Sequence, residues 1–160
     1  MTLFDLSGRR ALVTGSGQGI GLALAEALAR AGAVAVLNGR DAAKLDAAAA
    51  ELRQAGLSVE TAPFDVTDPD AARAGVDRIE AEAGPIDILV NNAGIQRRAP
   101  LEDFAPETWR ELMQTNLDSV FFVAQAVARH MLGRKRGKII NIGSVQSELG
   151  RPTIAPYAAS

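Results

Sequence analysis

The sequence contains no cysteine and only one histidine, and each of these shortages excludes a class of site. Without cysteine the chain forms no disulfide and no thiolate metal site. For the same reason the sequence does not indicate whether the protein works in an oxidising or a reducing compartment. Since His130 is the only histidine, neither a histidine metal cluster nor a serine–histidine catalytic couple has support. We therefore expect no metal site.

An excess of charge of one sign and a long apolar run are also missing. The net charge is −2, so no general attraction to nucleic acid or to a membrane surface follows. The basic run at residues 133–138 has no interleaved aromatic residue and follows a predicted helix, whose C-terminal end favours cations. No apolar run approaches the ~18 residues of a membrane span, and the charged first ten residues do not resemble a signal peptide. We expect a cytoplasmic protein with no nucleic-acid and no membrane partner.

Short apolar runs alternate with longer amphipathic ones along a chain long enough for one domain. Asp41 is placed to cap one helix, and Pro69 occupies the first position of another. Alternation at these lengths indicates an α/β fold, a Rossmann-like, doubly wound parallel sheet with helices on both faces. We predict strands within residues 10–15, 33–39, 58–66, 86–94 and 137–144, and helices at 19–32, 41–55, 68–84 and 106–132.

A glycine-rich loop, "TGSGQGIG" at residues 14–21, joins the first predicted strand to the first predicted helix. Glycines let the backbone approach a phosphate, and the helix N-terminus offers free N–H groups and the positive end of its dipole. The spacing of Gly15, Gly19 and Gly21 is not that of the G-x-G-x-x-G fingerprint. The spacing alone favours a phosphate site, and an adenosyl site of the methyltransferase type is the alternative.

The pattern T-G-x-x-x-G-x-G resembles the cofactor loop of the short-chain dehydrogenase/reductase family, and the other motifs of that family follow in order. Asp65 and Val66 come after the third strand, and "NNAG" (residues 91–94) comes after the fourth. The resemblance covers the whole chain and implies an NAD(P)-dependent oxidoreductase that transfers a hydride between a nicotinamide and a carbonyl or secondary alcohol. It implies cofactor contacts for Gly15, Ser16, Gln18, Gly19, Ile20, Gly21, Asp65, Val66, Asn92, Ala93, Gly94 and Tyr157.

The end of the second strand, Asn38-Gly39-Arg40, bears on the choice between NADP and NAD. An acidic residue there would hydrogen-bond the ribose 2′-hydroxyl of NAD and repel a 2′-phosphate. No carboxylate occupies the ribose position, and the planar fork of Arg40 suits a phosphate. We predict that Asn38 and Arg40 bind cofactor and that NADP is preferred, with NAD as a second cofactor. In the alternative interpretation, Arg40 is a solvated loop residue.

Asn116, Ser144 and Tyr157 occupy the places of the family's catalytic residues. The resemblance implies that Tyr157 passes a proton, Ser144 binds the substrate oxygen and Asn116 anchors a water molecule. Free tyrosine has a pKa of ~10, and in the family a lysine four residues further on supplies the positive charge that it needs. That lysine would follow Ser160, where the sequence ends. We therefore expect residues 1–160 to be the N-terminal part of a longer NAD(P)-binding domain, and to bind cofactor poorly alone.

Three segments, "LNGRD", "NNAGIQRRAPLEDF" and "SVQSELGRPTIAPYAAS", resemble the subgroup of gluconate 5-dehydrogenases, or 5-keto-gluconate reductases. Gln96, Arg97, Gln146 and Arg151 are predicted substrate residues, because a sugar acid would suit an arginine clamp. In the alternative interpretation they are surface residues of loops.

Two other functions stay open. A 3-oxoacyl-carrier-protein reductase of the same family would have identical active-site residues. A non-catalytic nucleotide-binding module would need no lysine, although it would have no reason to keep both Ser144 and Tyr157. The family resemblance also implies a homodimer or homotetramer.

Overall fold

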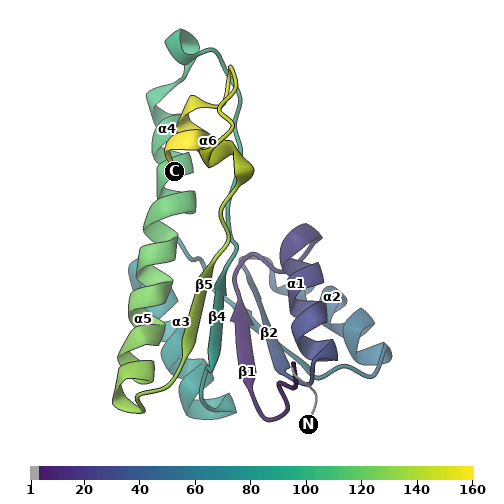
Figure 1. Ribbon diagram of the computed structural model, residues 1–160. Coiled ribbons are helices and arrows are strands. Elements are labelled where there is room, and N and C mark those ends of the chain that lie inside the picture. The colour runs from purple at the N-terminus through teal and green to yellow at the C-terminus, as the bar shows by residue number, and fades with distance from the viewer. Residues whose placement is uncertain (1–3) are drawn as a thin grey trace.

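The computed structural model describes residues 4–160 and contains an open sheet of five parallel strands (Figure 1). The strand order is β3-β2-β1-β4-β5, so the order along the chain reverses between β1 and β4. Every segment predicted to contain a strand does contain one, and the predicted doubly wound fold is confirmed. The strands are β1 (Arg10–Val13), β2 (Val34–Gly39), β3 (Val59–Pro63), β4 (Ile88–Asn91) and β5 (Lys138–Asn141).

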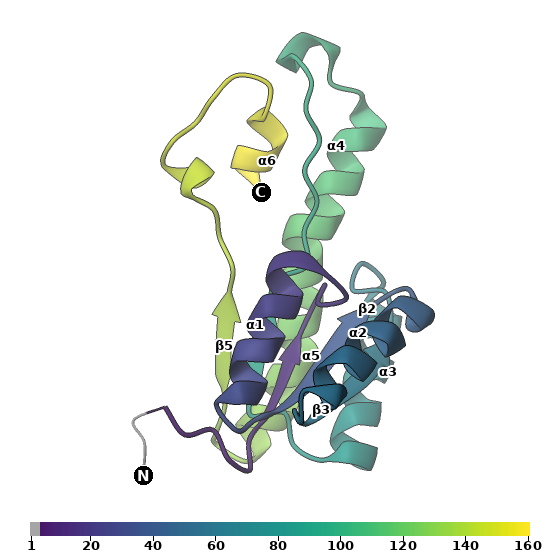
Figure 2. The same ribbon diagram turned by 90° about the vertical axis from the view of Figure 1, so that its right-hand side faces the viewer.

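Helices cover both faces of the sheet, α1 and α2 on one and α3 and α5 on the other (Figure 2). In Figure 1, α4 and α6 stand beyond the ends to which the strand arrows point. The helices are α1 (Gly19–Arg30), α2 (Ala42–Gln54), α3 (Pro69–Arg78), α4 (Pro106–Met113), α5 (Ser119–Gly133) and α6 (Ala155–Ala159).

The core consists of two layers because successive residues of a strand point to opposite faces. In β1, Ala11 and Val13 pack under α1 and α2, whereas Leu12 packs under α3 and α5, and all three are fully buried. A strand that is buried on both sides needs apolar residues at consecutive positions. This explains why the central strands β1, β2 and β4 appear in the sequence as short, largely apolar runs, whereas the edge strands β3 and β5 are more exposed.

The residues predicted to begin two of the helices, Asp41 and Pro69, do so. The Asp41 carboxylate accepts a hydrogen bond of 3.1 Å from the Lys44 N–H at the start of α2. Asp68 caps α3, with Pro69 at the first helical position. Gly32, just after α1, has a φ of 101°, and a Cβ there would lie 2.8 Å from the Ser7 Oγ. Glycine is therefore required at the turn that leads into β2.

The chain is helical without a break over residues 106–133, as predicted for 106–132, but the helix is not α-helical throughout. A π turn at Gln114–Asp118 separates α4 from α5. The amide of Asn116, within this turn, hydrogen-bonds both the N–H and the C=O of Ile95. A second π turn, Ile79–Ala83, follows α3, and α6 and the 3₁₀ segments Leu101–Asp103 and Val145–Ser147 were not predicted.

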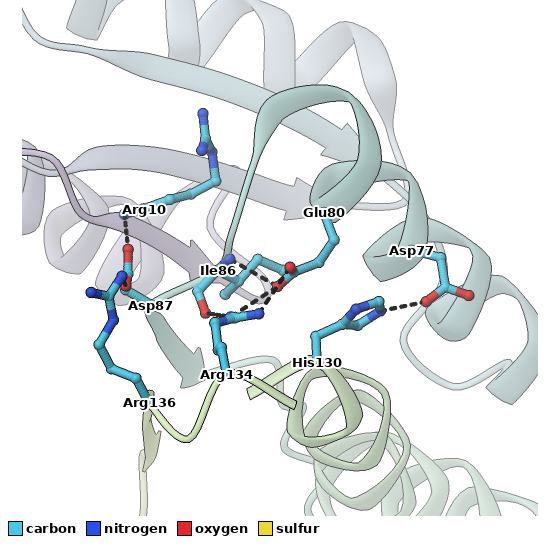
Figure 3. A network of polar contacts seen from close by, with 8 residues as sticks. All are labelled: Arg10, Asp77, Glu80, Ile86, Asp87, His130, Arg134 and Arg136. Carbon is cyan, nitrogen blue, oxygen red and sulfur yellow. Dashed lines mark hydrogen bonds and ion pairs between the residues drawn. The ribbon is translucent and has the colours of Figure 1, made fainter. Parts of the chain in front are cut away.

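At the other end of the sheet, where the strands begin, ion pairs connect the two halves of the chain (Figure 3). Glu80 accepts two hydrogen bonds of 3.0 Å from the Arg134 guanidinium and one of 2.9 Å from the Ile86 N–H. Asp87, which is buried, lies 2.7 Å from an Arg136 nitrogen. The contacts join the starts of β4 and β5 to α3 and α5, far from the carboxyl ends of the strands.

His130, the only histidine, lies on α5 with its Nε2 2.7 Å from an Asp77 carboxylate oxygen on α3 (Figure 3). Over residues 4–160 there is no cluster of three or more His, Cys, Asp or Glu side chains suited to a metal ion. Over the same residues, no helix combines the length and the apolar character needed to cross a membrane.

Candidate active site

A cavity of about 500 Å³ lies at the carboxyl ends of β1, β2, β3 and β4. It includes the point where the strand order reverses, which is where open α/β sheets bind their ligands. Its wall consists of Gly15, Gly17, Gln18, Asn38, Gly39, Arg40, Asp41, Lys44, Leu45, Phe64, Asp65, Val66, Thr67, Asn92, Ala93, Gly94, Ile95, Arg97, Glu111, Gln114 and Thr115.

The glycine-rich loop packs directly on the segment that follows β4. Gly15 has a φ of 63°, and a Cβ there would lie 2.8 Å from the Ala93 Cα. A Cβ on Gly21 would lie 2.5 Å from both the Asn92 Nδ2 and the Gly15 carbonyl oxygen. These two positions accept only glycine, because any larger residue would push the loop away from the NNAG segment.

The first turn of α1 has the features of a phosphate site. Its N-cap, Gln18, has extended backbone and makes no side-chain cap hydrogen bond. The early N–H groups of an α-helix lack helical partners, so those of Gly19, Ile20 and Gly21 are left for an anion. Gly19 has a φ of 58° and open space where a Cβ would be.

Ser16 and Asn38, both predicted cofactor residues, are buried and hold strands together with their side chains. The Ser16 hydroxyl donates to the Val13 carbonyl at 2.7 Å and accepts from the Asn38 N–H at 2.9 Å. The Asn38 Nδ2 donates to two carbonyls of the β3 segment, while its Oδ1 is buried with no partner among residues 4–160. Asn38 lines the cavity, and this oxygen is a buried polar group of its side chain.

Arg40 and Asp65 form an oppositely charged pair at the ends of β2 and β3. An Arg40 nitrogen lies 3.8 Å from the Asp65 Oδ2, and the arginine side chain is 78% exposed. The Asp65 Oδ1 accepts hydrogen bonds from the Thr67 N–H at 2.9 Å and from its hydroxyl at 2.7 Å. Val66, next to Asp65, is buried in the wall.

Thr14 organises the NNAG segment, a role that the sequence analysis did not assign to it. Its hydroxyl oxygen accepts hydrogen bonds from the N–H groups of Asn92 at 2.9 Å and Ala93 at 3.0 Å. In return, the Asn92 Nδ2 donates to the carbonyls of Thr14 at 3.0 Å and Gly15 at 3.3 Å. In the sequence, the indication of this role was the position of Thr14 directly after a buried apolar run.

The three predicted catalytic residues come from three segments that meet beyond the strand ends. Asn116, in the π turn, accepts from the Ile95 N–H at 2.8 Å and donates to the Ser160 hydroxyl at 3.0 Å. Ser160 ends the segment of α6 that carries Tyr157, which is half-buried. Ser144 caps the 3₁₀ segment Val145–Ser147, against which α6 packs. The fold thus brings the elements of all three residues together.

Arg97, a predicted substrate residue, lines the wall of the cavity. One of its nitrogens donates to the Glu111 carboxylate at 3.0 Å, and another donates to the Gln96 carbonyl at 3.2 Å. Its charge is therefore already paired on the α4 side of the cavity.

Gln96 lies next to Arg97 in the loop after β4, whereas Gln146 and Arg151, the remaining two residues predicted to bind substrate, lie in the loop after β5. The Gln146 Oε1 is buried and has no partner among residues 4–160, and Arg151 is exposed. This loop meets the loop after β4 through a hydrogen bond of 3.2 Å from the Ala99 N–H to the Thr153 carbonyl. The two loops that carry the predicted substrate residues are thus in contact.

The sequence analysis also missed several residues of the wall. They lie in the glycine-rich loop, at the start of α2, in the loop after β3 and in the helical turns that precede Asn116, at distances along the chain that no local pattern connects. These residues are Gly17, Asp41, Lys44, Leu45, Phe64, Thr67, Glu111, Gln114 and Thr115.

Comparison with known proteins gives curated relatives over nearly the whole chain. The chain is 64% identical over 158 residues to gluconate 5-dehydrogenase of Gluconobacter oxydans (strain 621H). It is 51% identical over 158 residues to 5-keto-D-gluconate 5-reductase of Escherichia coli (strain K12). In both cases the match covers 99% of the chain and 62% of the relative, so the chain spans less than two thirds of the length of these proteins.

A solved structure agrees with these matches. The gluconate 5-dehydrogenase from Burkholderia cenocepacia J2315, in complex with NADP and tartrate, superimposes with a TM-score of 0.94 at 62% sequence identity. The superposition covers 98% of this chain and 61% of that one. The family model described as short chain dehydrogenase matches residues 9–160. The chain therefore belongs to the short chain dehydrogenase family.

Proposed function

We propose that the protein formed by this chain is an NADP-dependent oxidoreductase that interconverts a carbonyl and a secondary alcohol. The observation that carries this proposal is the cavity at the switch point of the sheet, walled by the glycine-rich loop and the NNAG segment. The NADP complex of the similar Burkholderia protein supports it. The bound nicotinamide would supply the chemistry, by giving or taking a hydride at its C4.

The residues present fit such a cofactor. The N–H groups at the start of α1 would bind its phosphates, and Asp65 and Val66 lie in the wall where an adenine would pack. Arg40, exposed at the end of β2 with no carboxylate at Gly39, would hold a 2′-phosphate, which favours NADP over NAD. The buried and unpartnered Asn38 Oδ1 fits a site that is completed by a polar ligand.

In this proposal the catalytic side chains of the chain act on the substrate oxygen. Ser144 donates a hydrogen bond to that oxygen, and Tyr157 gives it a proton during reduction or removes one during oxidation. Asn116 acts by holding the loop after β4 against the helix that carries Tyr157, through its contacts with Ile95 and Ser160.

We propose a sugar acid of the gluconate type as the substrate. The names of the Gluconobacter and Escherichia relatives support this choice, and the tartrate in the Burkholderia complex is also a hydroxy acid. Arg151 has no ion pair among residues 4–160, so its guanidinium is available for a carboxylate, whereas Arg97 is engaged with Glu111.

The proposal includes a homo-oligomer. An apolar stripe follows the outer side of α5 and the π turn before it, with Leu117 48%, Phe121 61% and Leu132 76% exposed. Side chains of this size and spacing on one helix face favour packing against a second copy. The cytoplasmic location stays a prediction from the sequence.

The test is an enzymatic assay of the protein as its gene encodes it, with NADPH and 5-keto-gluconate as the two substrates. Turnover is measured as the decrease in absorbance of the reduced cofactor. Turnover of this substrate, at a kcat/KM at least about tenfold above that for a 3-oxoacyl thioester, is the expected result. The reverse preference would favour the acyl-carrier-protein reductase. The Tyr157→Phe variant should still bind NADPH but lose turnover. Binding of NADPH without turnover of either substrate would favour the non-catalytic module.

A further inference from the structure

Two opposite charges stand side by side where a 2′-phosphate would bind. Gly39 and Pro63 are partners in the register of β2 and β3, so Arg40 and Asp65 follow the ends of neighbouring strands. Both residues line the cavity, with a nitrogen–oxygen distance of 3.8 Å between their charged groups. The proximity therefore arises from the sheet and not from a chance meeting of surface side chains.

The two partners differ in how firmly they are held. Thr67 donates two hydrogen bonds to the Asp65 Oδ1, which fixes the carboxylate and leaves its Oδ2 toward Arg40. Arg40 is 78% exposed, against 36% for Asp65. Exposed ion pairs are weak, so Arg40 is able to leave Asp65 for another anion.

We infer that Asp65 sets the selectivity of the site between NADP and NAD by competing with the 2′-phosphate for Arg40. This inference rests on the cofactor site of the proposed function. NADP must draw the guanidinium away from the carboxylate, whereas NAD, which lacks the 2′-phosphate, leaves the pair intact. The carboxylate thereby weakens the preference for NADP and keeps NAD usable as a second cofactor.

The test compares dissociation constants for NADPH and NADH in the protein as its gene encodes it, by titration at low ionic strength. In Asp65→Asn the amide keeps the shape of the side chain and an oxygen for the Thr67 hydrogen bonds, but it no longer attracts Arg40. The preference for NADPH over NADH should rise about fivefold, the factor expected for two unit charges at this distance in water. High salt should shrink the change.

Three further variants make the result specific. In Arg40→Gln the preference for NADPH should fall, and adding Asp65→Asn to that background should change it by less than about twofold. Glu111→Gln removes a different carboxylate of the same wall, which is paired with Arg97, and should leave the ratio within about twofold of the wild type.

Equal weakening of both cofactors by Asp65→Asn would overturn the inference, because Asp65 would then act only on the adenosine that they share. The inference would also be overturned if Asp65→Asn changed the preference for NADPH over NADH equally in the wild type and in the Arg40→Gln variant. If the wild-type protein binds neither cofactor, the proposed function itself is refuted and the inference falls with it.

Discussion

Replacing Gly21 by alanine places a methyl group at the tightest point of the proposed phosphate loop. The added Cβ would lie 2.5 Å from the Asn92 Nδ2, 2.5 Å from the Gly15 carbonyl oxygen and 2.9 Å from the Ser16 Cα. Two of these atoms belong to the backbone, and the Asn92 amide is held by its hydrogen bonds to Thr14 and Gly15. No neighbour is a flexible side-chain end that is able to move away.

The cost follows from these contacts. Overpacking of this kind costs about 1–3 kcal/mol, and each hydrogen bond lost from Asn92 adds about 1 kcal/mol. The gain in helix propensity from glycine to alanine returns about 0.5–1 kcal/mol. We expect the free energy of unfolding of Gly21→Ala to fall by about 2–4 kcal/mol, with weaker NADPH binding because the loop moves away from the NNAG segment.

Urea unfolding followed by circular dichroism measures the first quantity, and titration with NADPH measures the second. Gly133→Ala is the matched control, because Gly133 ends α5 without a left-handed φ and a Cβ there would have no neighbour within 4 Å. That variant should be as stable as the wild type or slightly more stable. An unchanged unfolding midpoint and an unchanged NADPH affinity in Gly21→Ala would refute the packing argument.

Two more predictions concern opposite ends of the sheet. Gly39→Asp should shift the cofactor preference toward NADH by about tenfold or more, because a carboxylate there would repel a 2′-phosphate. The preference is measured as the ratio of the dissociation constants for NADPH and NADH. The fold should tolerate this substitution, since the new Cβ would contact only the Leu45 side chain, at 3.5 Å. Glu80→Gln should lower the free energy of unfolding by about 1–3 kcal/mol, because the Arg134 ion pair is largely shielded from water. It should leave the NADPH affinity unchanged, and Glu26→Gln, at an exposed helix pair, should cost less than about 0.5 kcal/mol. A cofactor preference unmoved by the aspartate, or equal losses from the two glutamates, would contradict these expectations.

The sheet was predictable because its determinants are local. The central strands β1, β2 and β4 are buried on both faces, which produces largely apolar runs, and these runs are bounded by residues with clear conformational roles, such as Gly32 or the cap Asp41. Parallel order then follows from the intervening helices. The position of the glycine-rich loop and the NNAG segment at one edge of the sheet was a consequence of that order.

The contacts that shape the site were not predictable because they join residues far apart in the sequence. Nothing in the composition of Gln114–Asp118 marks a π turn; no glycine or proline occurs there, and the turn accompanies a bond between Asn116 and Ile95. The pairing of Arg97 with Glu111 likewise depends on how α4 stands over the cavity. Spacing identifies side chains that are able to act, whereas their orientation depends on the packing of separate elements.

The π turn between α4 and α5 has a consequence for insertions and deletions. A π turn holds one more residue per turn than an α-helix, so deleting one residue from it would restore regular α-helical geometry. Five residues in π geometry rotate the backbone through about the same angle as four residues in α geometry, so the helices before and after the deletion would keep their relative orientation. Leu112 and Val123, which are both fully buried and lie on either side of the turn, would therefore stay buried. A deletion within α4 or α5 would instead rotate one end of the helix by about 100° relative to the other, so the π turn is the point where this helix best tolerates the loss of one residue.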